Sequence, residues 1–530
     1  MKKKSFLFLA VFLTFLVYAP SLKNSFTWDD FLVAAHNQFI QSPQNLPDVF
    51  TRQYLTSPSD LSELRKRNIG AGEVSYRPVV TLSYFFDHFL WKLDPFGYHL
   101  TNLILHLINT VLFFYFARFI FKEDKYAFFA SLVFSLHPVQ SEAVLAISFR
   151  EDLLAFLFFM LSLLLYNQSK KTDKRFPAYF GSLLCYFLAL FSKEMAITLP
   201  AVIFLWDWYF DRENRKKNLF IKLKNIYSGY ILVSLFYLWV WCFPMARPPG
   251  YVPGYVEGNF LINLLTMLKV FCIYLHWLFL GVDIHVVMTP IPFVVRNFNN
   301  LYVLVSIFSI VLSVFMILKG KKLKIIISFS LLLFFTTLFP VFNIIPIQNI
   351  MGARYLYLPM AGFSLFLVEM FRKVMCSKFV QGRQIFSYTL MILFISMPIF
   401  YSILTLSRGL VWSNEITLRK EFVERQPDNM NSYLTLANSY LEAGLFDEME
   451  AQVTLVKRMA PFSAGPHQWL ADAYIKLGRY EDALRELKMS IEKVPYDFGN
   501  HSELCRWLKD LGRSVEWREC TEEFKRLNPF

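Results

Sequence analysis

The sequence is poor in charged residues. Only 18% of its 530 residues are Asp, Glu, Lys or Arg, whereas 55% are hydrophobic and the mean hydropathy is +0.38. A soluble fold with this composition would not have enough polar side chains to cover its apolar surface. The composition therefore excludes an ordinary soluble protein and makes a lipid bilayer the natural solvent for most of the chain.

Cysteine is also scarce, and the spacing of the six residues does not match a metal-binding motif. Cys505 and Cys520 are close enough in sequence to face each other across a helical hairpin, where an oxidising compartment would allow a disulfide. Four others lie in or beside apolar segments and are expected to pack there: Cys185, Cys242, Cys272 and Cys376.

The N-terminus lacks the small-residue cleavage site of a secretory signal, although Lys2–Lys4 precede an apolar run at residues 5–19. We interpret it as an uncleaved signal anchor with a cytoplasmic N-terminus. The net charge of +13 is not gathered on one domain but falls in short Lys and Arg clusters between apolar runs. This pattern is typical of cytoplasmic loops and does not indicate a nucleic-acid partner.

Eleven apolar runs approach the roughly 20 residues that a helix needs to cross a bilayer. They centre on residues 6–21, 100–121, 126–141, 152–167, 177–191, 196–210, 228–244, 301–318, 325–341, 355–371 and 385–405. The sequence therefore predicts an all-α polytopic membrane bundle. With the N-terminus inside, eleven crossings place the C-terminus outside the cytoplasm.

A further apolar run at residues 260–280 is ambiguous, because the residues that follow it include Asp283, His285 and two prolines. A full crossing here would place the lysine cluster at 319–324 outside. We therefore predict that 260–295 is a re-entrant or interfacial segment on the outer side. The same count places five loops outside: 21–98, 137–152, 192–195, 245–259 and 342–355.

The last hundred residues repeat with a period of 34. The period relates Pro427, Pro461, Pro495 and Pro529, and likewise Gly444, Gly478 and Gly512, and Leu436, Leu470 and Leu504. This is the period of tetratricopeptide repeats (TPRs), which stack helix pairs into a solenoid. We predict a membrane domain at 1–410 and a TPR domain of about three repeats at 411–530, whose concave surface suits a peptide or protein partner.

Two adjacent carboxylates, Asp29 and Asp30, follow the first predicted span. A solvated pair in a loop is ordinary. Alternatively, one of them could act as a general base towards an acceptor hydroxyl, with its pKa raised by the like charge of its neighbour. The residues alone leave both interpretations open.

Further polar residues gather in the segments predicted outside. His99, Asn102, His106 and Asn109 fall on one helical face, which could line a cavity or join helices. A metal site at His99 and His106 would lack a third ligand. Other candidates are Arg77, His137, Glu142, Arg150, Lys193, Glu194 and Arg354. The cations suit a phosphate, or they pair with nearby carboxylates.

Nine segments, in their order and in their positions relative to the spans, resemble the transmembrane and TPR-containing O-mannosyltransferase family. They are Phe26–Asp30, Tyr76–Pro78, Gly97–His106, His137–Glu142, Arg150–Leu154, Lys193–Thr198, Phe339–Asn343, Ala353–Pro359 and Trp412–Glu415. The resemblance covers nearly the whole chain. It departs at the repeats, which are fewer than in animal relatives, and at Ser148-Phe149, where we expect a glycine.

The resemblance implies a GT-C-like glycosyltransferase that transfers a hexose, expected to be mannose, from a polyprenyl-phosphate sugar to an extracytoplasmic hydroxyl. It assigns catalysis to Asp29 and Asp30, with inversion and no protein nucleophile. It assigns substrate binding to Arg77, His99, His106, His137, Glu142, Arg150, Lys193, Glu194 and Arg354. No nucleotide-binding loop is expected, and none is found. The scattered acids permit a divalent cation, Mg or Mn, without requiring one.

Two other interpretations share these features. A lipid-linked glycan polymerase or ligase would have the same spans and outer polar residues, but it would not need a peptide-binding repeat array. A non-enzymatic TPR scaffold for envelope or secretion assembly would not need the acidic pair. The short repeat array favours a bacterial plasma membrane over the endoplasmic reticulum.

Overall fold

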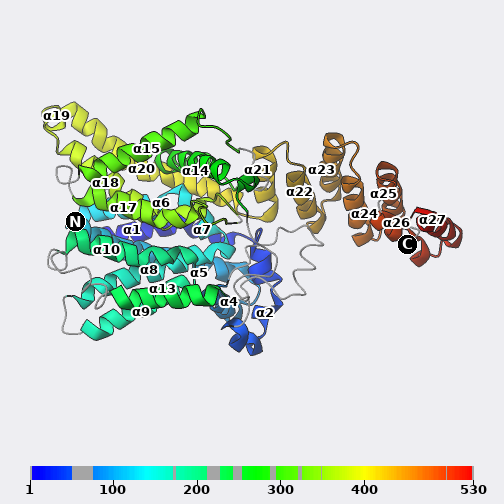
Figure 1. Ribbon diagram of the computed structural model, residues 1–530, viewed down its shortest axis with the longest axis horizontal. Coiled ribbons are helices and arrows are strands. Elements are labelled where there is room, and N and C mark those ends of the chain that lie inside the picture. The colour runs from blue at the N-terminus through cyan, green and yellow to red at the C-terminus, as the bar shows by residue number, and fades with distance from the viewer. Residues whose placement is uncertain are drawn as a thin grey trace. The chain divides into compact units, whose positions relative to one another are not determined.

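The computed structural model describes residues 3–50, 76–170, 175–211, 227–242, 254–286, 294–319, 325–347, 349–496 and 498–527. Every regular element within these ranges is a helix, so the predicted all-α class is confirmed (Figure 1). The chain divides into two compact units, Met1–Asn414 and Glu415–Phe530. The basic clusters at 212–224 and 321–324 lie outside the described residues.

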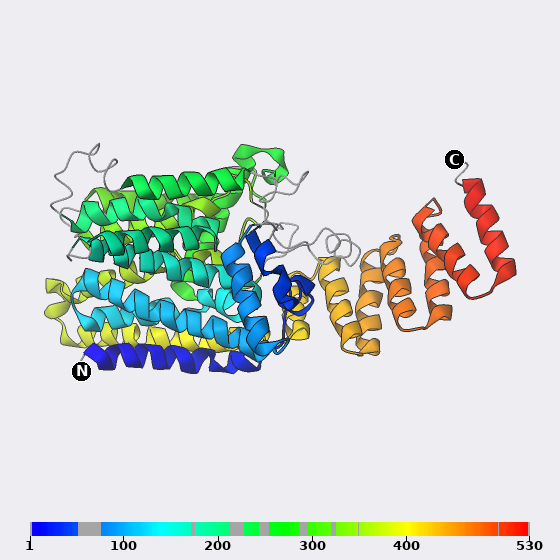
Figure 2. The same cartoon turned by 90° about the horizontal axis from the view of Figure 1, so that it is seen from below.

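Each of the eleven predicted spans falls on a helix of the first unit. The helices are α1 (Lys3–Tyr18), α5 (Pro95–Phe121), α6 (Asp124–Leu136), α8 (Arg150–Ser169), α9 (Arg175–Leu190), α10 (Leu199–Phe210), α13 (Ser228–Trp241), α15 (Leu301–Leu318), α17 (Ile325–Leu338), α18 (Met360–Met375) and α20 (Gln384–Val411). Although far apart in sequence, α1 and α20 lie side by side along the bundle (Figure 2).

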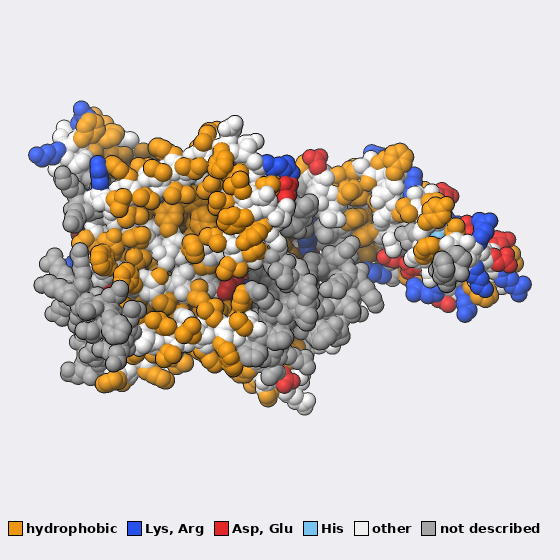
Figure 3. Space-filling view, viewed as in Figure 1, with side chains coloured by type: hydrophobic (Ala, Val, Ile, Leu, Met, Phe, Trp, Pro, Cys, Tyr) orange, Lys and Arg blue, Asp and Glu red, His pale blue; other side chains and the backbone are white. Residues whose placement is uncertain are grey.

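Fewer helices than predicted are long and apolar enough to cross a membrane unaided. Five described segments qualify, and a sixth if the bent pair Asp124–Leu136 and Pro138–Leu145 forms one span. The five are Ser5–Lys23, Pro95–Phe121, Phe260–Leu280, Leu301–Leu318 and Gln384–Val411. Several others are shorter, and α8 opens on three charged residues. Apolar side chains cover the displayed surface of this unit (Figure 3), as expected of an integral membrane protein.

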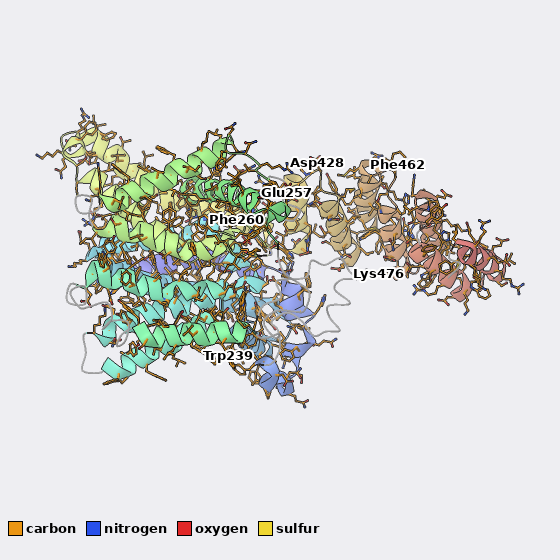
Figure 4. All side chains as sticks on the ribbon, viewed as in Figure 1. Trp239, Glu257, Phe260, Asp428, Phe462 and Lys476 are labelled. Atoms are coloured by element: carbon orange, nitrogen blue, oxygen red, sulfur yellow. A yellow bond between two sulfur atoms is a disulfide. The ribbon has the colours of Figure 1, made fainter. Side chains whose placement is uncertain are left out.

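The segment predicted to be re-entrant contains a continuous helix, α14 (Phe260–Leu280), which by length could cross a membrane. Figure 4 labels Phe260 at its start. Near that end, the Asn263 side chain donates to the carbonyl of Asn343 at 3.1 Å. Near the other end, Nε2 of His137 donates to the carbonyl of Leu278 at 3.0 Å. Asn343 and His137 both belong to loops that we predict on the outer side. That residues 260–295 enter and leave the membrane on this side therefore stays our prediction.

The first outer loop contains more regular structure than predicted. It forms η2 (Phe31–Ala35), α2 (Gln38–Gln41), η3 (Pro43–Phe50) and α4 (Pro78–Trp91). Pro78 occupies the first turn of α4, where its missing N–H leaves no hydrogen bond unmade. Leu32, Val33, Val80 and Tyr84 share one buried cluster with Leu154 of α8. This cluster fixes the acidic loop against the start of α8.

The second unit contains a lone helix followed by three helix pairs. The helices are α21 (Glu415–Arg425), α22 (Met430–Glu442), α23 (Phe446–Met459), α24 (Gly465–Lys476), α25 (Tyr480–Lys493), α26 (Phe498–Asp510) and α27 (Ser514–Leu527). Gly444, Gly478 and Gly512 each follow the first helix of a pair with φ between +71° and +75°. A residue with a Cβ is strained in this conformation, which explains why glycine recurs every 34 residues.

The two C-terminal cysteines form a disulfide. Cys505 lies on α26 and Cys520 on α27, and both belong to the buried cluster that contains Leu504 and Leu508. The bridge therefore joins the two helices of the last pair from within their own core.

Candidate functional site

The two adjacent aspartates have different surroundings. Asp30 is fully buried, and its Oδ1 accepts a hydrogen bond from the backbone N–H of Ser148 at 2.7 Å. Its Oδ2 accepts from the backbone N–H of Thr27 at 3.1 Å. Asp29 is only half-buried. Asp30 is thus bound into the protein, whereas Asp29 is the more exposed of the two residues.

Burial raises the pKa of Asp30 to about 7, against the opposing effect of the hydrogen bonds from Ser148 and Thr27. The sequence suggested a pKa raised by repulsion between the neighbouring carboxylates. For Asp30 the cause is instead the loss of water around a buried group.

This raised pKa predicts a pH-dependent stability. Folded Asp30 holds its proton up to about pH 7, whereas an unfolded aspartate loses it near pH 4, so the contribution of Asp30 falls as pH rises between these values. We expect the thermal midpoint of the wild type, relative to Asp30→Asn, to increase as pH is lowered from about 7 to about 4. Paired melting curves in detergent test this, and a constant difference across that window would contradict it.

A second group of side chains forms a charge cluster, which consists of Arg77, Glu142, Glu151, Asp152, Lys193, Glu194 and Arg354. Arg77 immediately precedes α4 and donates to Glu151 at 2.9 Å and to Glu194 at 3.2 Å. Lys193 donates to Asp152 at 2.6 Å. These contacts bring together three loops that the sequence predicted on the same side.

The remaining pair of the charge cluster joins a fourth loop to it. Arg354 donates to Glu142 from its side chain at 2.5 Å and from its backbone N–H at 3.1 Å. The ring of Tyr355 lies between two cations, 5.0 Å from the guanidinium of Arg354 and 5.4 Å from Nζ of Lys193. Two buried cations of the cluster therefore contact the same aromatic ring.

The acidic loop and the charge cluster meet at residues 148–152. The backbone of Ser148 binds Asp30, and the ring of Phe149 contacts both Trp28, with 6.2 Å between ring centroids, and the guanidinium of Arg354 at 4.1 Å. Phe149 has a negative φ, so the glycine that we expected in this step is not needed. The side chain of Phe149 instead links the two halves of the site.

Arg150, which we predict to bind substrate, lies in the protein interior, and a substrate contact by it stays a prediction. It is fully buried and pairs with Asp87 at 2.5 Å. Its Nε donates to Asn102 at 2.8 Å, and its guanidinium lies 4.7 Å from the ring of Tyr84. Arg150 therefore joins α4, α5 and α8 beneath the site. Its partner Asp87 was not among the predicted site residues, although a carboxylate between Phe86 and His88 in an otherwise apolar segment is a signal in the sequence.

The polar stripe of α5 joins helices. The ring of His106 accepts from the hydroxyl of Tyr357 at 2.8 Å and donates to the carbonyl of Ser135 at 3.1 Å. Asn109 donates to the carbonyl of Leu153 at 3.0 Å. His99 donates to the carbonyl of Ser25 at 3.5 Å, directly beside the acidic loop. Of the two alternatives for this stripe, these contacts favour the joining of helices.

His137 also has a structural setting. Its Nδ1 accepts from the backbone N–H of Val139 at 3.1 Å, and its Nε2 binds α14. Substrate contacts by His99, His106 and His137 stay predictions. Within the described ranges, no three His, Cys, Asp or Glu side chains are placed to hold one metal ion.

No protein-family profile matches the chain. It is 32% identical to mouse protein O-mannosyl-transferase TMTC2 over 238 residues, which cover 44% of this chain and 27% of that protein. It is 24% identical to protein O-mannosyl-transferase F38B6.6 of Caenorhabditis elegans over 457 residues, 84% of this chain and 61% of that protein. The match to human TMTC2, 32% over 230 residues, covers 42% of this chain and 26% of that protein.

The chain thus spans about a quarter of the length of the TMTC2 proteins that it matches. The longer match to the nematode protein extends the similarity over most of the chain, and human TMTC3 and TMTC1 also match. This chain is therefore similar to several TMTC protein O-mannosyl-transferases at modest identity, which agrees with the resemblance found in its sequence.

Proposed function

We propose that this chain is a membrane glycosyltransferase that moves a hexose, mannose by analogy with the names of its homologues, from a polyprenyl-phosphate sugar to a hydroxyl of a protein. One observation carries the proposal. Residues 148–152 contact both the acidic loop, which contains Asp29 and Asp30, and the charge cluster, which contains the buried cations. Such a transfer needs a base for the acceptor and positive charge for the departing phosphate.

The two aspartates take different roles in this proposal. Asp29 accepts the proton of the acceptor hydroxyl while the oxygen of that hydroxyl forms a bond to the anomeric carbon of the sugar. The bond from that carbon to the phosphate oxygen breaks, and the electron pair leaves with the lipid phosphate. Asp30, held by Ser148 and Thr27, fixes the loop and does not exchange protons with substrate.

Lys193 and Arg354 are the cations that we assign to the phosphate, because both contact the ring of Tyr355 and Arg354 also contacts Phe149. A guanidinium has five N–H groups, so Arg354 can keep its contact with Glu142 and still donate to a phosphate oxygen. Arg77 and Glu194 line the same cluster, and Glu194 is 49% exposed. These two residues therefore complete the proposed donor-binding surface.

The acceptor is a protein, and we assign its recognition to the repeat unit, whose stacked helix pairs provide a surface for an extended peptide. A requirement for Mg or Mn stays a prediction that a chelator tests directly. We also retain a bacterial plasma membrane as the proposed location, with the N-terminus in the cytoplasm.

The disulfide supports an extracytoplasmic repeat unit, because such bonds persist in oxidising compartments. We expect a thiol-reactive mass tag, added under denaturing conditions without reductant, to modify neither Cys505 nor Cys520, and to modify both after reduction. The four other cysteines are free thiols and provide the internal control. Tagging of both residues without reductant would contradict the proposed orientation of the repeat unit.

The function is tested with the full chain reconstituted in nanodiscs, polyprenyl-phosphate mannose and candidate secreted proteins. Intact-mass analysis should show hexose increments on an acceptor with the wild-type chain and none without it. Absence of transfer to every acceptor, together with stable capture of a partner by the repeats, would support the scaffold instead. Extension of a lipid-linked glycan without protein modification would support the polymerase.

A further inference from the structure

The last membrane helix ends against the acidic loop. Trp412, the residue after α20, is fully buried, and its ring stacks on Trp28 with 6.5 Å between centroids and 20° between planes. The next residue, Ser413, accepts a hydrogen bond at its carbonyl from the backbone N–H of Ser25 at 3.0 Å. Two contacts therefore tie the end of α20 to the segment that leads into Asp29.

Trp28 has an unusual backbone conformation. Its φ is +50°, in the left-handed region that a residue with a large side chain rarely occupies. Such a conformation persists only where the surroundings determine it, and here the Trp28 ring contacts Trp412 and Phe149. Because Asp29 is the next residue, the backbone angle at Trp28 sets the direction of the Asp29 carboxylate.

The same stack links Asp29 to the proposed phosphate site. Phe149 contacts Trp28 and also lies 4.1 Å from the guanidinium of Arg354. A shift of Trp28 would therefore change the separation between the base and the cation that act on the two sides of the reacting carbon. A displacement of about 1 Å in such a pair can cost about 10²-fold in rate.

We propose that Trp412 is a positioning residue for the transfer reaction, which holds Trp28 in its left-handed conformation and thereby orients Asp29. This inference rests on the proposed function. Within the described part of the chain, Nε1 of Trp412 is buried with no hydrogen-bond partner. The ring therefore acts by its stacking surface, and a phenylalanine at this position should replace it.

The test compares Trp412→Ala and Trp412→Phe in nanodiscs. We expect Trp412→Ala to lower kcat by about 10- to 100-fold with the KM for polyprenyl-phosphate mannose within about twofold, and Trp412→Phe to retain most of kcat. Trp239→Ala, which removes a 58%-exposed tryptophan on α13 (Figure 4), is the matched control and should not change kcat.

A double-mutant cycle separates positioning from general damage. If the two rings act as one unit, the fold-loss of kcat in the double variant, Trp28→Ala combined with Trp412→Ala, is well below the product of the fold-losses in the two single variants. Multiplicative losses, an unchanged kcat in Trp412→Ala, or an equal loss in Trp412→Phe would each overturn the inference. If Trp412→Ala does not fold, Trp412→Leu is judged by the same criteria. An inactive wild type would instead refute the proposed function.

Discussion

Asp29→Asn should lower hexose transfer by about 10²- to 10⁴-fold, the range that a positioned general base contributes. The asparagine is close to aspartate in size but cannot accept the acceptor proton. Asp29 is half-buried, so the substitution does not place a new polar group in the core. The rate is measured as hexose incorporated per minute at saturating donor, and the KM for the donor should change little.

The control for Asp29→Asn is Asp48→Asn, which removes the same charge from the same outer loop but lies outside the proposed site. We expect this variant to transfer hexose at the wild-type rate. Turnover at the wild-type rate in Asp29→Asn would show that Asp29 is not the base, and Asp30 would then be the remaining carboxylate of the pair. Loss of both activity and the melting transition would show that Asp29 supports the fold instead.

Arg150→Leu should reduce the free energy of unfolding by about 3–5 kcal/mol, the cost of removing one partner from a buried ion pair. Arg150 and Asp87 are both fully buried, so the substitution leaves the Asp87 carboxylate uncompensated in the interior. The measurement is the thermal or denaturant transition of the reconstituted chain, followed by circular dichroism.

An exposed pair of equal length provides the control for Arg150→Leu. Arg118 and Asp124 are also 2.5 Å apart, but Arg118 is 40% exposed, so Arg118→Leu should cost no more than about 1 kcal/mol. The double substitution Arg150→Leu with Asp87→Leu should recover part of the loss, because it removes the stranded charge. Equal losses in Arg150→Leu and Arg118→Leu would show that burial does not determine the cost.

Much of the fold follows from patterns that act locally. Apolar runs of membrane length predict helices because a helix satisfies its own backbone hydrogen bonds in lipid, and each run does fall on a helix. The 34-residue period predicts the helix pairs because glycine is needed at the same turn of each. The helices inside the first outer loop were missed, since their apolar residues become a core only after Leu154 of α8 packs against them.

The candidate site could be predicted by residue type but not by partner. Asp29 was singled out as a possible general base, and Lys193 and Arg354 as cations that suit a phosphate. Which carboxylate each cation meets depends on loops brought together by tertiary packing, which the sequence does not encode locally. The same limit explains why the ion pair of Arg150 with Asp87 could not be predicted from the sequence.

Residues 148–152 make successive contacts with the acidic loop, with Arg354, with Asp87, with Arg77 and with Lys193. A helix turns by about 100° per residue, so deleting or inserting one residue here would rotate each later side chain away from its partner. Length variation at this turn should therefore be far more harmful than any single substitution in it. In a library of one-residue insertions and deletions, we expect functional variants in the exposed connections between helices and none at residues 148–152.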